Sequence, residues 1–261
     1  MPARRALLFA AAALALSGCS LRKTAVRYSA SMAETGLPAL YQEHDVQTAK
    51  EALIPLIKIT ETLYQNDKEN RAMSAMLAQG YCGYALMFLE DDDPARASDF
   101  YNRGVEFTAK NGDVSLRFWN AFCRAGYIQL NLDKPAAIAE LPKVDEAADY
   151  VLAHDPSFYY NSAYTIKGAL LSARPKMLGG DPDKAKAYFD KALAGEGYDF
   201  LPNRYVMAKT YAVAVQDEEL FEKTLESILD ADPAALPQMR LVNEATKLKA
   251  KKLLEKKNEL F

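Results

Sequence analysis

The residue types that carry most enzyme chemistry form no recognised catalytic pattern in this sequence of 261 residues. The two histidines, His44 and His154, lie far apart in the chain. No His-Glu-x-x-His metal motif, Gly-x-Ser-x-Gly nucleophile turn or Walker phosphate loop occurs. Gly179-Gly180 lacks a following Lys-Ser or Lys-Thr, so we interpret it as a turn. We therefore predict that the protein is not an enzyme, with no catalytic residue and no cofactor.

One acidic run, from Glu90 to Asp93, could be mistaken for a metal site. It lacks the spaced ligands and the glycine of a calcium loop. Asp93 followed by Pro94 is instead typical of a helix start, with aspartate as N-cap and proline in the first turn. We therefore expect a solvated helix cap and no bound metal.

The N-terminus carries the most specific chemical signal. Arg4 and Arg5 precede a wholly apolar segment, 6–16, which is too short to span a bilayer. Leu16-Ser17-Gly18-Cys19 then forms a bacterial lipobox, which predicts cleavage before Cys19 and acylation of that residue. Several acyl chains anchor stably, because each buried CH₂ contributes roughly 0.8 kcal/mol. Ser20, in place of Asp, favours the outer membrane, facing the periplasm; plain secretion with an incidental cysteine is the alternative.

The other two cysteines, Cys82 and Cys123, fall inside predicted helices. From their positions we favour buried free thiols over a disulfide.

Composition predicts a helical protein with a sizeable core. Half of the residues are hydrophobic and the net charge is −3, which gives no indication of nucleic-acid binding. We predict a signal peptide at 1–18, a lipidated tether with one loosely packed helix at 19–41, and an all-α domain at 42–261. Helices are expected at 46–64 with a kink or break at Pro55, 71–88, 95–110, 114–130, 133–154 with an interruption near Pro142, 163–173, 182–194, 201–215, 217–230 and 236–258.

Two helical hairpins repeat at an offset of 88 residues. Asp93-Pro94 matches Asp181-Pro182, Gly80 matches Gly168, and small and aromatic positions agree between the copies. Small residues at helix crossings beside an aromatic residue are typical of tetratricopeptide repeats, in which hairpins stack on one another. We favour stacked antiparallel hairpins of a cryptic tetratricopeptide type, with both glycines at crossings; an ordinary bundle is the alternative.

The last predicted helix is lysine-rich on one side, with Lys247, Lys249, Lys251, Lys252, Lys256 and Lys257. We favour a capping helix with a solvated face, and contact with anionic lipid is the alternative.

Several segments resemble the T-component family associated with TRAP transporters (TatT). They are Cys19 to Lys23, Glu90 to Ala97, Leu116 to Tyr127, Ala173 to Pro182, Glu219 to Glu222 and Asn258 to Phe261. The resemblance implies a periplasmic lipoprotein of cryptic tetratricopeptide hairpins with a pore or groove. It also implies a homo-trimer that associates with a TRAP-type solute-binding protein and hands over a small hydrophobic or amphipathic ligand. A general protein-binding adaptor in envelope assembly is the alternative function.

The family supplies no ligand residues, so the candidate site is inferred from the residues themselves. Concave surfaces of repeat proteins are where ligands usually bind. The aromatic helix offers Phe118, Trp119 and Tyr127, and Phe118 and Trp119 lie about 100° apart on it, so one of them can face a lumen. The following hairpin offers Tyr159, Tyr160, Tyr164 and, at its loop, Arg174, whose guanidinium suits a carboxylate. The alternative places Trp119 in the core and Arg174 as a helix cap.

Overall fold

The computed structural model describes residues 23–33, 35–109, 112–174, 177 and 179–261. The predicted signal peptide and Cys19 lie outside these residues. Within the described ranges every regular element is a helix, which confirms the all-α prediction. The elements are α2 Val46–Tyr64, α3 Arg71–Tyr84, η1 Ala85–Leu89, α4 Pro94–Phe107, α5 Val114–Gln129, α6 Pro135–Ile138, α7 Leu141–His154, α8 Phe158–Ala173, α9 Pro182–Ala192, α10 Glu196–Asp199, α11 Leu201–Val206, η3 Met207–Ala212, α12 Glu218–Asp230, η4 Pro233–Ala235, η5 Pro237–Met239, α13 Arg240–Glu255 and α14 Lys257–Leu260.

Side-chain caps determine where most of the long helices begin. The carboxylates of Asp93 and Asp181 accept hydrogen bonds from the backbone N–H groups of Arg96 and Lys184, as their sequence context predicts. Asp45, Asp113 and Asp217 cap α2, α5 and α12 in the same way. Pro55 lies inside α2 without breaking it, so the predicted break does not occur, although the helix bounds are as predicted.

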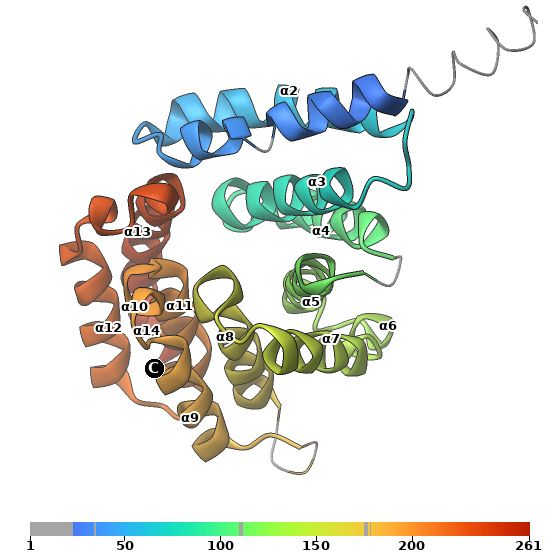
Figure 1. The fold of residues 1–261 in the computed structure, drawn as a ribbon. Coiled ribbons are helices and arrows are strands. Elements are labelled where there is room, and N and C mark those ends of the chain that lie inside the picture. Colours follow the sequence, from blue (N-terminus) through green and yellow to red (C-terminus); the bar gives the residue numbers. More distant parts are fainter. Residues whose placement is uncertain (1–22, 34, 110–111, 175–176, 178) are drawn as a thin grey trace, which may run out of the picture.

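Successive helices form antiparallel hairpins that follow one another around a ring (Figure 1). The path runs from α2 through α3, α4 and α5 to α7 and α8, and then through α9 and α11 to α12 and α13. The last long helix, α13, returns to contact α2 and η1. Chain regions far apart in sequence therefore meet and close the ring.

Helices α3 and η1 form the centre of the first half of the ring. Residues Arg71–Leu89 are the one described helix that is long and apolar enough to cross a membrane, but 56% of the most apolar stretch is buried inside the molecule. Its buried residues, including Leu77, Tyr81 and Phe88, belong to the main hydrophobic core. This burial agrees with the prediction of a core helix at 71–88. The last turn, η1, is a π-helix, a widening that is often found at functional sites.

Both predicted close crossings are present. A Cβ atom built on Gly168 would lie 2.8 Å from the ring of Phe189 in α9, and one on Gly80 would lie 2.9 Å from the side chain of Ile57 in α2. The two glycines meet different kinds of neighbour. Gly80 of α3 contacts α2, the helix before its hairpin, whereas Gly168 of α8 contacts α9, the second helix of its own hairpin. The tetratricopeptide relationship between the two hairpins stays a prediction.

The preference for free thiols is wrong, because Cys82 and Cys123 form a disulfide that links α3 to α5. The Cα atoms of the two residues lie 5.5 Å apart. Gly104 of α4 makes room for the bond: a Cβ atom there would lie 2.1 Å from the Cys82 sulfur and 2.7 Å from the Cys123 sulfur. The position of each cysteine within its own helix cannot reveal this three-helix contact.

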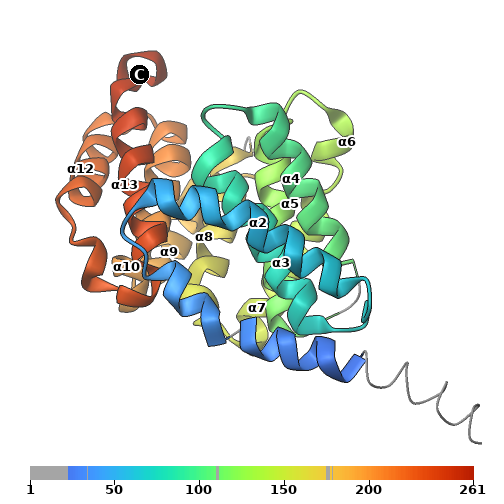
Figure 2. The same cartoon turned by 90° about the horizontal axis from the view of Figure 1, so that it is seen from above.

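The segment before α2 is more ordered and better packed than the predicted tether. Residues 23–33 and 35–41 are helical, and Figure 2 shows them beside α2 and α3. Val26 and Ala30 are buried against Met73 of α3, with Leu63 and Tyr64 of α2 nearby. Tyr41 is buried in a separate cluster with Phe200 and Val242. The packed unit therefore begins well before residue 42.

Candidate ligand cavity

The ring of helices surrounds a partly open cavity of about 270 Å³. Because neighbouring helices are antiparallel, every second long helix runs in the same direction. These parallel units are four: α3 together with η1, then α5, then α8, and finally α11 together with η3. These four units supply most of the wall. Lining residues on α8 extend from Tyr159 at its start to Arg174 just beyond its end, so the cavity follows the length of the helices. Most lining side chains are apolar, as is usual for a small-molecule site.

One end of the cavity is aromatic. Tyr41, Trp119, Tyr159 and Phe200 line it near the N-terminal ends of the parallel helices. The rings of Trp119 and Tyr159 lie 5.0 Å apart in an edge-to-face arrangement, and those of Tyr159 and Phe200 lie 5.4 Å apart. Burial raises the pKa of the Tyr41 and Tyr159 hydroxyls, so both stay neutral. This end therefore suits apolar groups.

Tyr159 owes its position to a left-handed turn at the start of α8. Tyr159, Tyr160 and Asn161 have φ angles of 49°, 58° and 64°. For residues other than glycine this conformation costs roughly 1–2 kcal/mol each. Asn161 holds the turn through a 2.8 Å hydrogen bond from its side-chain amide to the carbonyl of Ala194, and Asn203 donates to the carbonyl of Tyr160, also at 2.8 Å. Such strain is commonly retained at functional sites.

The opposite end of the cavity carries the charged groups. Glu90 follows η1, Lys209 lies in η3, and Arg174 follows α8. All three lie toward the C-terminal ends of the parallel helices. The cavity is thus polarised, with aromatic rings at one end and charges at the other.

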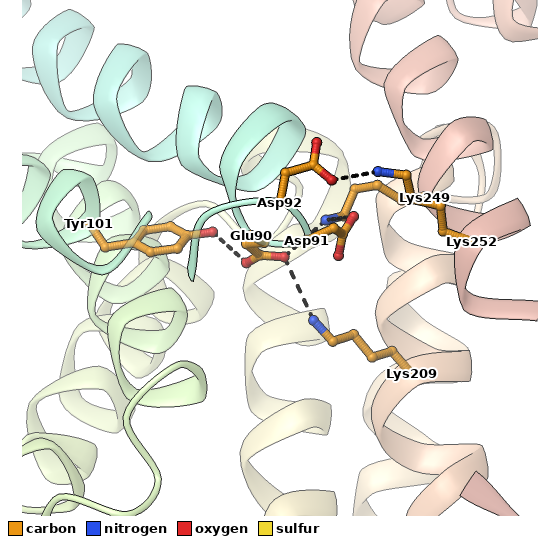
Figure 3. A network of polar contacts seen from close by, with 7 residues as sticks. All are labelled: Glu90, Asp91, Asp92, Tyr101, Lys209, Lys249 and Lys252. Atoms are coloured by element: carbon orange, nitrogen blue, oxygen red, sulfur yellow. Dashed lines mark hydrogen bonds and ion pairs between the residues drawn. The ribbon is translucent and has the colours of Figure 1, made fainter. Parts of the chain in front are cut away.

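Glu90 is the centre of a buried ionic network (Figure 3). Its carboxylate accepts a 2.7 Å hydrogen bond from the Tyr101 hydroxyl and lies 3.1 Å from Nζ of Lys249 and 3.7 Å from Nζ of Lys209. Burial alone would raise the pKa of Glu90, but the charges of Lys209 and Lys249 outweigh it and hold the pKa below its ordinary value. The network leaves Glu90 ionised.

Two predictions of solvated charge are wrong at these residues. The Glu90 side chain is only 6% exposed, and Asp91 pairs with Lys249 at 2.9 Å. Lys249 is 5% exposed, so this lysine of the last long helix faces inward and closes the ring. Lys252 pairs with Asp92 at 2.9 Å in a more exposed position. Sequence reasoning missed these contacts because the partners are separated by more than half of the chain.

Arg174 lines the cavity and carries a buried donor. Its Nε atom is buried and has no hydrogen-bond partner among the described residues. One terminal nitrogen lies 3.6 Å from the carboxylate of Asp145, which already pairs with Lys167 at 2.6 Å. Arg174 is therefore only loosely paired, and an unsatisfied buried donor favours an anionic acceptor.

The structure separates the predicted site residues into two groups. Trp119, Arg174 and Tyr159 line the cavity. Trp119 also belongs to the main core and Arg174 is the C-cap residue of α8, as the alternative expected. Phe118 belongs to the same core and does not line the cavity, which decides the choice between the two adjacent aromatic residues. The remaining three do not line the cavity: Tyr127 packs against the core, Tyr160 stacks on Phe200, and Tyr164 packs against Tyr188.

Other lining residues were not singled out from the sequence. They include Tyr41, Gln79, Glu90 and Lys209. Tyr41 lies in the segment interpreted as a tether, and Gln79 lies in a helix that is apolar nearly all round. An isolated polar residue in such a helix is the one signal that could have pointed to Gln79. Among the described residues no three His, Cys, Asp or Glu side chains gather where they could hold a metal ion.

Comparison with known proteins relates the chain to a family. A family model described as TRAP transporter T-component matches residues 42–111 and 107–261. These two segments together span the ring of helices from just before α2 to the C-terminal residue. No curated protein matches the chain.

Proposed function

The chain belongs to the TRAP transporter T-component family, and from this premise we propose that it docks the solute-binding protein of a TRAP transporter and holds or channels a small amphipathic solute. Membership associates the chain with TRAP transport systems in an accessory role. The choice of partner and the handling of the solute are our inference.

The polarised cavity is the observation that carries this proposal. A packed core leaves few voids larger than a water molecule, whereas this cavity has about 270 Å³. Its wall combines aromatic rings with the loosely paired guanidinium of Arg174. An amphipathic carboxylate would place its charge at Arg174 and its apolar part along α5 and α8.

The cellular setting is also proposed. The lipobox ending at Cys19 supports a lipid anchor, and Ser20 supports an outer-membrane position facing the periplasm. The family resemblance supports a homo-trimer. In that setting the anchored protein would meet a diffusing periplasmic solute-binding protein.

The experiment is co-purification of the protein with periplasmic solute-binding proteins, followed by mass spectrometry of small molecules that elute with it. Trp119→Ala and Arg174→Ala are compared with Phe118→Leu, which alters the neighbouring core position outside the cavity wall. We expect the two cavity variants to lose the co-eluting solute to a greater extent than their loss of stability accounts for, since Trp119 also packs in the core. Phe118→Leu should lose stability and keep the solute.

Two results would contradict the proposal. Loss of solute in strict proportion to loss of stability in all three variants would make Trp119 and Arg174 structural residues. Capture of a protein partner with no solute in any preparation would favour the alternative of a general protein-binding adaptor.

A further inference from the structure

A second cavity lies beside the aromatic end of the first. It has about 220 Å³ and lies between helical residues 35–41, α2 and α3. Its wall is almost wholly apolar, with Leu37, Leu40, Leu53, Ile57, Met76 and Leu77 among the lining residues. Gly36, which is exposed, lies at its rim. This space is unsuited to a charged or strongly hydrated ligand.

Two polar side chains separate this second cavity from the central one. Tyr41 and Gln79 line both cavities. The amide nitrogen of Gln79 donates a 2.6 Å hydrogen bond to the Tyr41 hydroxyl. The partition is therefore formed by side chains and not by helix backbone, and Gln79 is also hydrogen-bonded to Tyr159 of the aromatic end.

The two cavities and the charged end lie in sequence. The second cavity adjoins Tyr41 at the aromatic end of the central cavity, and Arg174 lies at the other end beside the Glu90–Lys209 ion pair. An apolar path thus leads away from Arg174, through the partition, into the second, apolar cavity. A ligand that matches this order has one anionic head and one long alkyl tail.

We propose that the two cavities form one composite site for a single-chain amphiphile with an anionic head, and that the Tyr41–Gln79 pair is the partition through which its tail passes. The head binds at Arg174, and a tail too long for the central cavity displaces the Gln79 amide from the Tyr41 hydroxyl and enters the second cavity. A short tail stays in the central cavity and leaves the partition closed. The pair therefore sets the preference for chain length. This inference rests on the proposed binding of a solute in the central cavity.

The chain supplies its own optical reporter, because Trp119 is its single tryptophan and lines the central cavity. The experiment uses the mature chain with Cys19→Ser, which has no acyl chains and keeps every described residue. Co-purifying lipid is removed, and the protein is then titrated with octanoate and with hexadecanoate. Trp119 fluorescence gives a dissociation constant for each. We expect hexadecanoate to bind at least tenfold more tightly than octanoate.

Blocking the second cavity is the decisive variant. Thr60 of α2 is buried and lines it, whereas Thr62 of the same helix is exposed and does not. Thr60→Phe should weaken hexadecanoate binding at least tenfold and change octanoate binding less than twofold. The matched control, Thr62→Phe, should change neither. Where circular dichroism shows Thr60→Phe to be misfolded, Gly36→Phe at the rim takes its place with the same expectation.

Opening the partition gives the opposite effect. Tyr41→Phe keeps the ring and removes the hydroxyl that binds Gln79, so a long tail no longer has to break that bond. We expect about fivefold tighter binding of hexadecanoate with octanoate unchanged, which corresponds to one net hydrogen bond. Arg174→Ala should weaken both ligands by the same factor, because both heads bind there.

The results distinguish two kinds of failure. If both ligands bind the parent protein but Thr60→Phe or Gly36→Phe weakens them equally or not at all, the composite site is wrong and the proposed function stands. If neither ligand alters Trp119 fluorescence nor is retained on gel filtration, solute binding in the central cavity is wrong as well.

Discussion

At the scale of single residues, Glu90 is a buried carboxylate that joins charges from both halves of the ring. Two lysines from the second half of the ring, Lys209 and Lys249, and one hydroxyl from α4, Tyr101, meet its carboxylate. Asp92, two residues later, pairs with Lys252 at 2.9 Å, but both side chains are more than half exposed. The two acidic residues provide a matched comparison of a buried and an exposed ion pair.

We expect Glu90→Gln to destabilise the fold by about 3 kcal/mol, because it removes a buried charge that pairs with Lys209 and leaves buried Lys249 with Asp91 alone. Asp92→Asn should cost less than about 1 kcal/mol, since the exposed pair is screened by water and ions. Chemical denaturation of both variants measures the difference. Equal losses would mean that the Glu90 network is as solvated as the surface pair.

The same carboxylate gives a pH dependence. The pKa of Glu90 in the fold is below its ordinary value of 4.5. A carboxyl with a lowered pKa stabilises the fold above the unfolded-state pKa, and this contribution is lost as the pH falls through the folded-state pKa. The unfolding free energy of the parent should therefore fall from about pH 5 to pH 3 more steeply than that of Glu90→Gln. Parallel denaturation curves for the two proteins would contradict an ionised Glu90.

At the scale of elements, helix pairs depend on where glycine permits close approach. Gly168 of α8 lies against Phe189 of α9, and Phe189 is fully buried, so its ring has little room to move. Gly83 of α3 is also helical, but a Cβ atom there would meet only the terminal methyl of Met87, at 4.0 Å. The same substitution should therefore have opposite effects at the two positions.

Gly168→Ala should destabilise the protein by roughly 1–3 kcal/mol through overpacking against Phe189. Gly83→Ala should stabilise it by roughly 0.5–1 kcal/mol, because alanine loses less backbone entropy in a helix. Thermal unfolding followed by circular dichroism measures both changes. An unchanged melting temperature in Gly168→Ala would remove the close-crossing interpretation.

The disulfide between α3 and α5 is the covalent link between elements. It joins residues 41 apart in sequence. In the chain-entropy description a loop of this length stabilises the fold by about 4 kcal/mol. Cys82→Ala combined with Cys123→Ala should lower the unfolding free energy by about that amount. Reductant should lower the unfolding free energy of the parent and leave that of the double variant unchanged. If prolonged incubation of the parent with a thiol reductant does not change its unfolding free energy, the link is contradicted.

At the scale of the whole molecule, the proposed position of the ring in the cell rests on a residue outside the described structure. The lipobox predicts that Cys19 carries a lipid anchor, so Cys19→Ala should move the protein from the membrane fraction to the soluble periplasmic fraction and change its gel mobility. Ser20→Ala serves as the control and should leave the protein membrane-bound. A Cys19→Ala protein that stays in the membrane fraction with unchanged gel mobility would contradict the lipid-anchor proposal.

Ring closure is a property that no single hairpin has. Contacts of α13 with α2 and η1 bring Lys249 to Glu90 and Asp91, which lie in the first half of the chain. The closure also encloses the cavity, because its wall is drawn from helices in both halves. Stability of the ring and shape of the cavity are therefore coupled through the same buried charges.

The sequence by itself determined that the chain is helical and where several helices begin, although α8 begins at Phe158 instead of 163 and the helix predicted at 236–258 is divided into η5, α13 and α14. Helix α2 has the predicted bounds, and the aspartate caps at Asp93 and Asp181 lie where the pattern placed them. These signals are local: a cap and an apolar stripe act within one or two turns, so they are readable from neighbouring residues. The same holds for Gly80 and Gly168 as points of close approach.

Only the tertiary structure decided which residues meet across the ring. Whether Phe118 or Trp119 faces the cavity depends on the orientation of α5 among its neighbours, and the pairing of Cys82 with Cys123 depends on the space that Gly104 leaves. The local sequence predicts that Glu90 is a solvated surface charge, whereas in the fold Lys249 of α13 pairs with it. Each of these outcomes depends on how successive hairpins are oriented relative to one another around the ring. No short segment of sequence encodes that orientation, so the cavity and its charged residues are defined only by the closed ring.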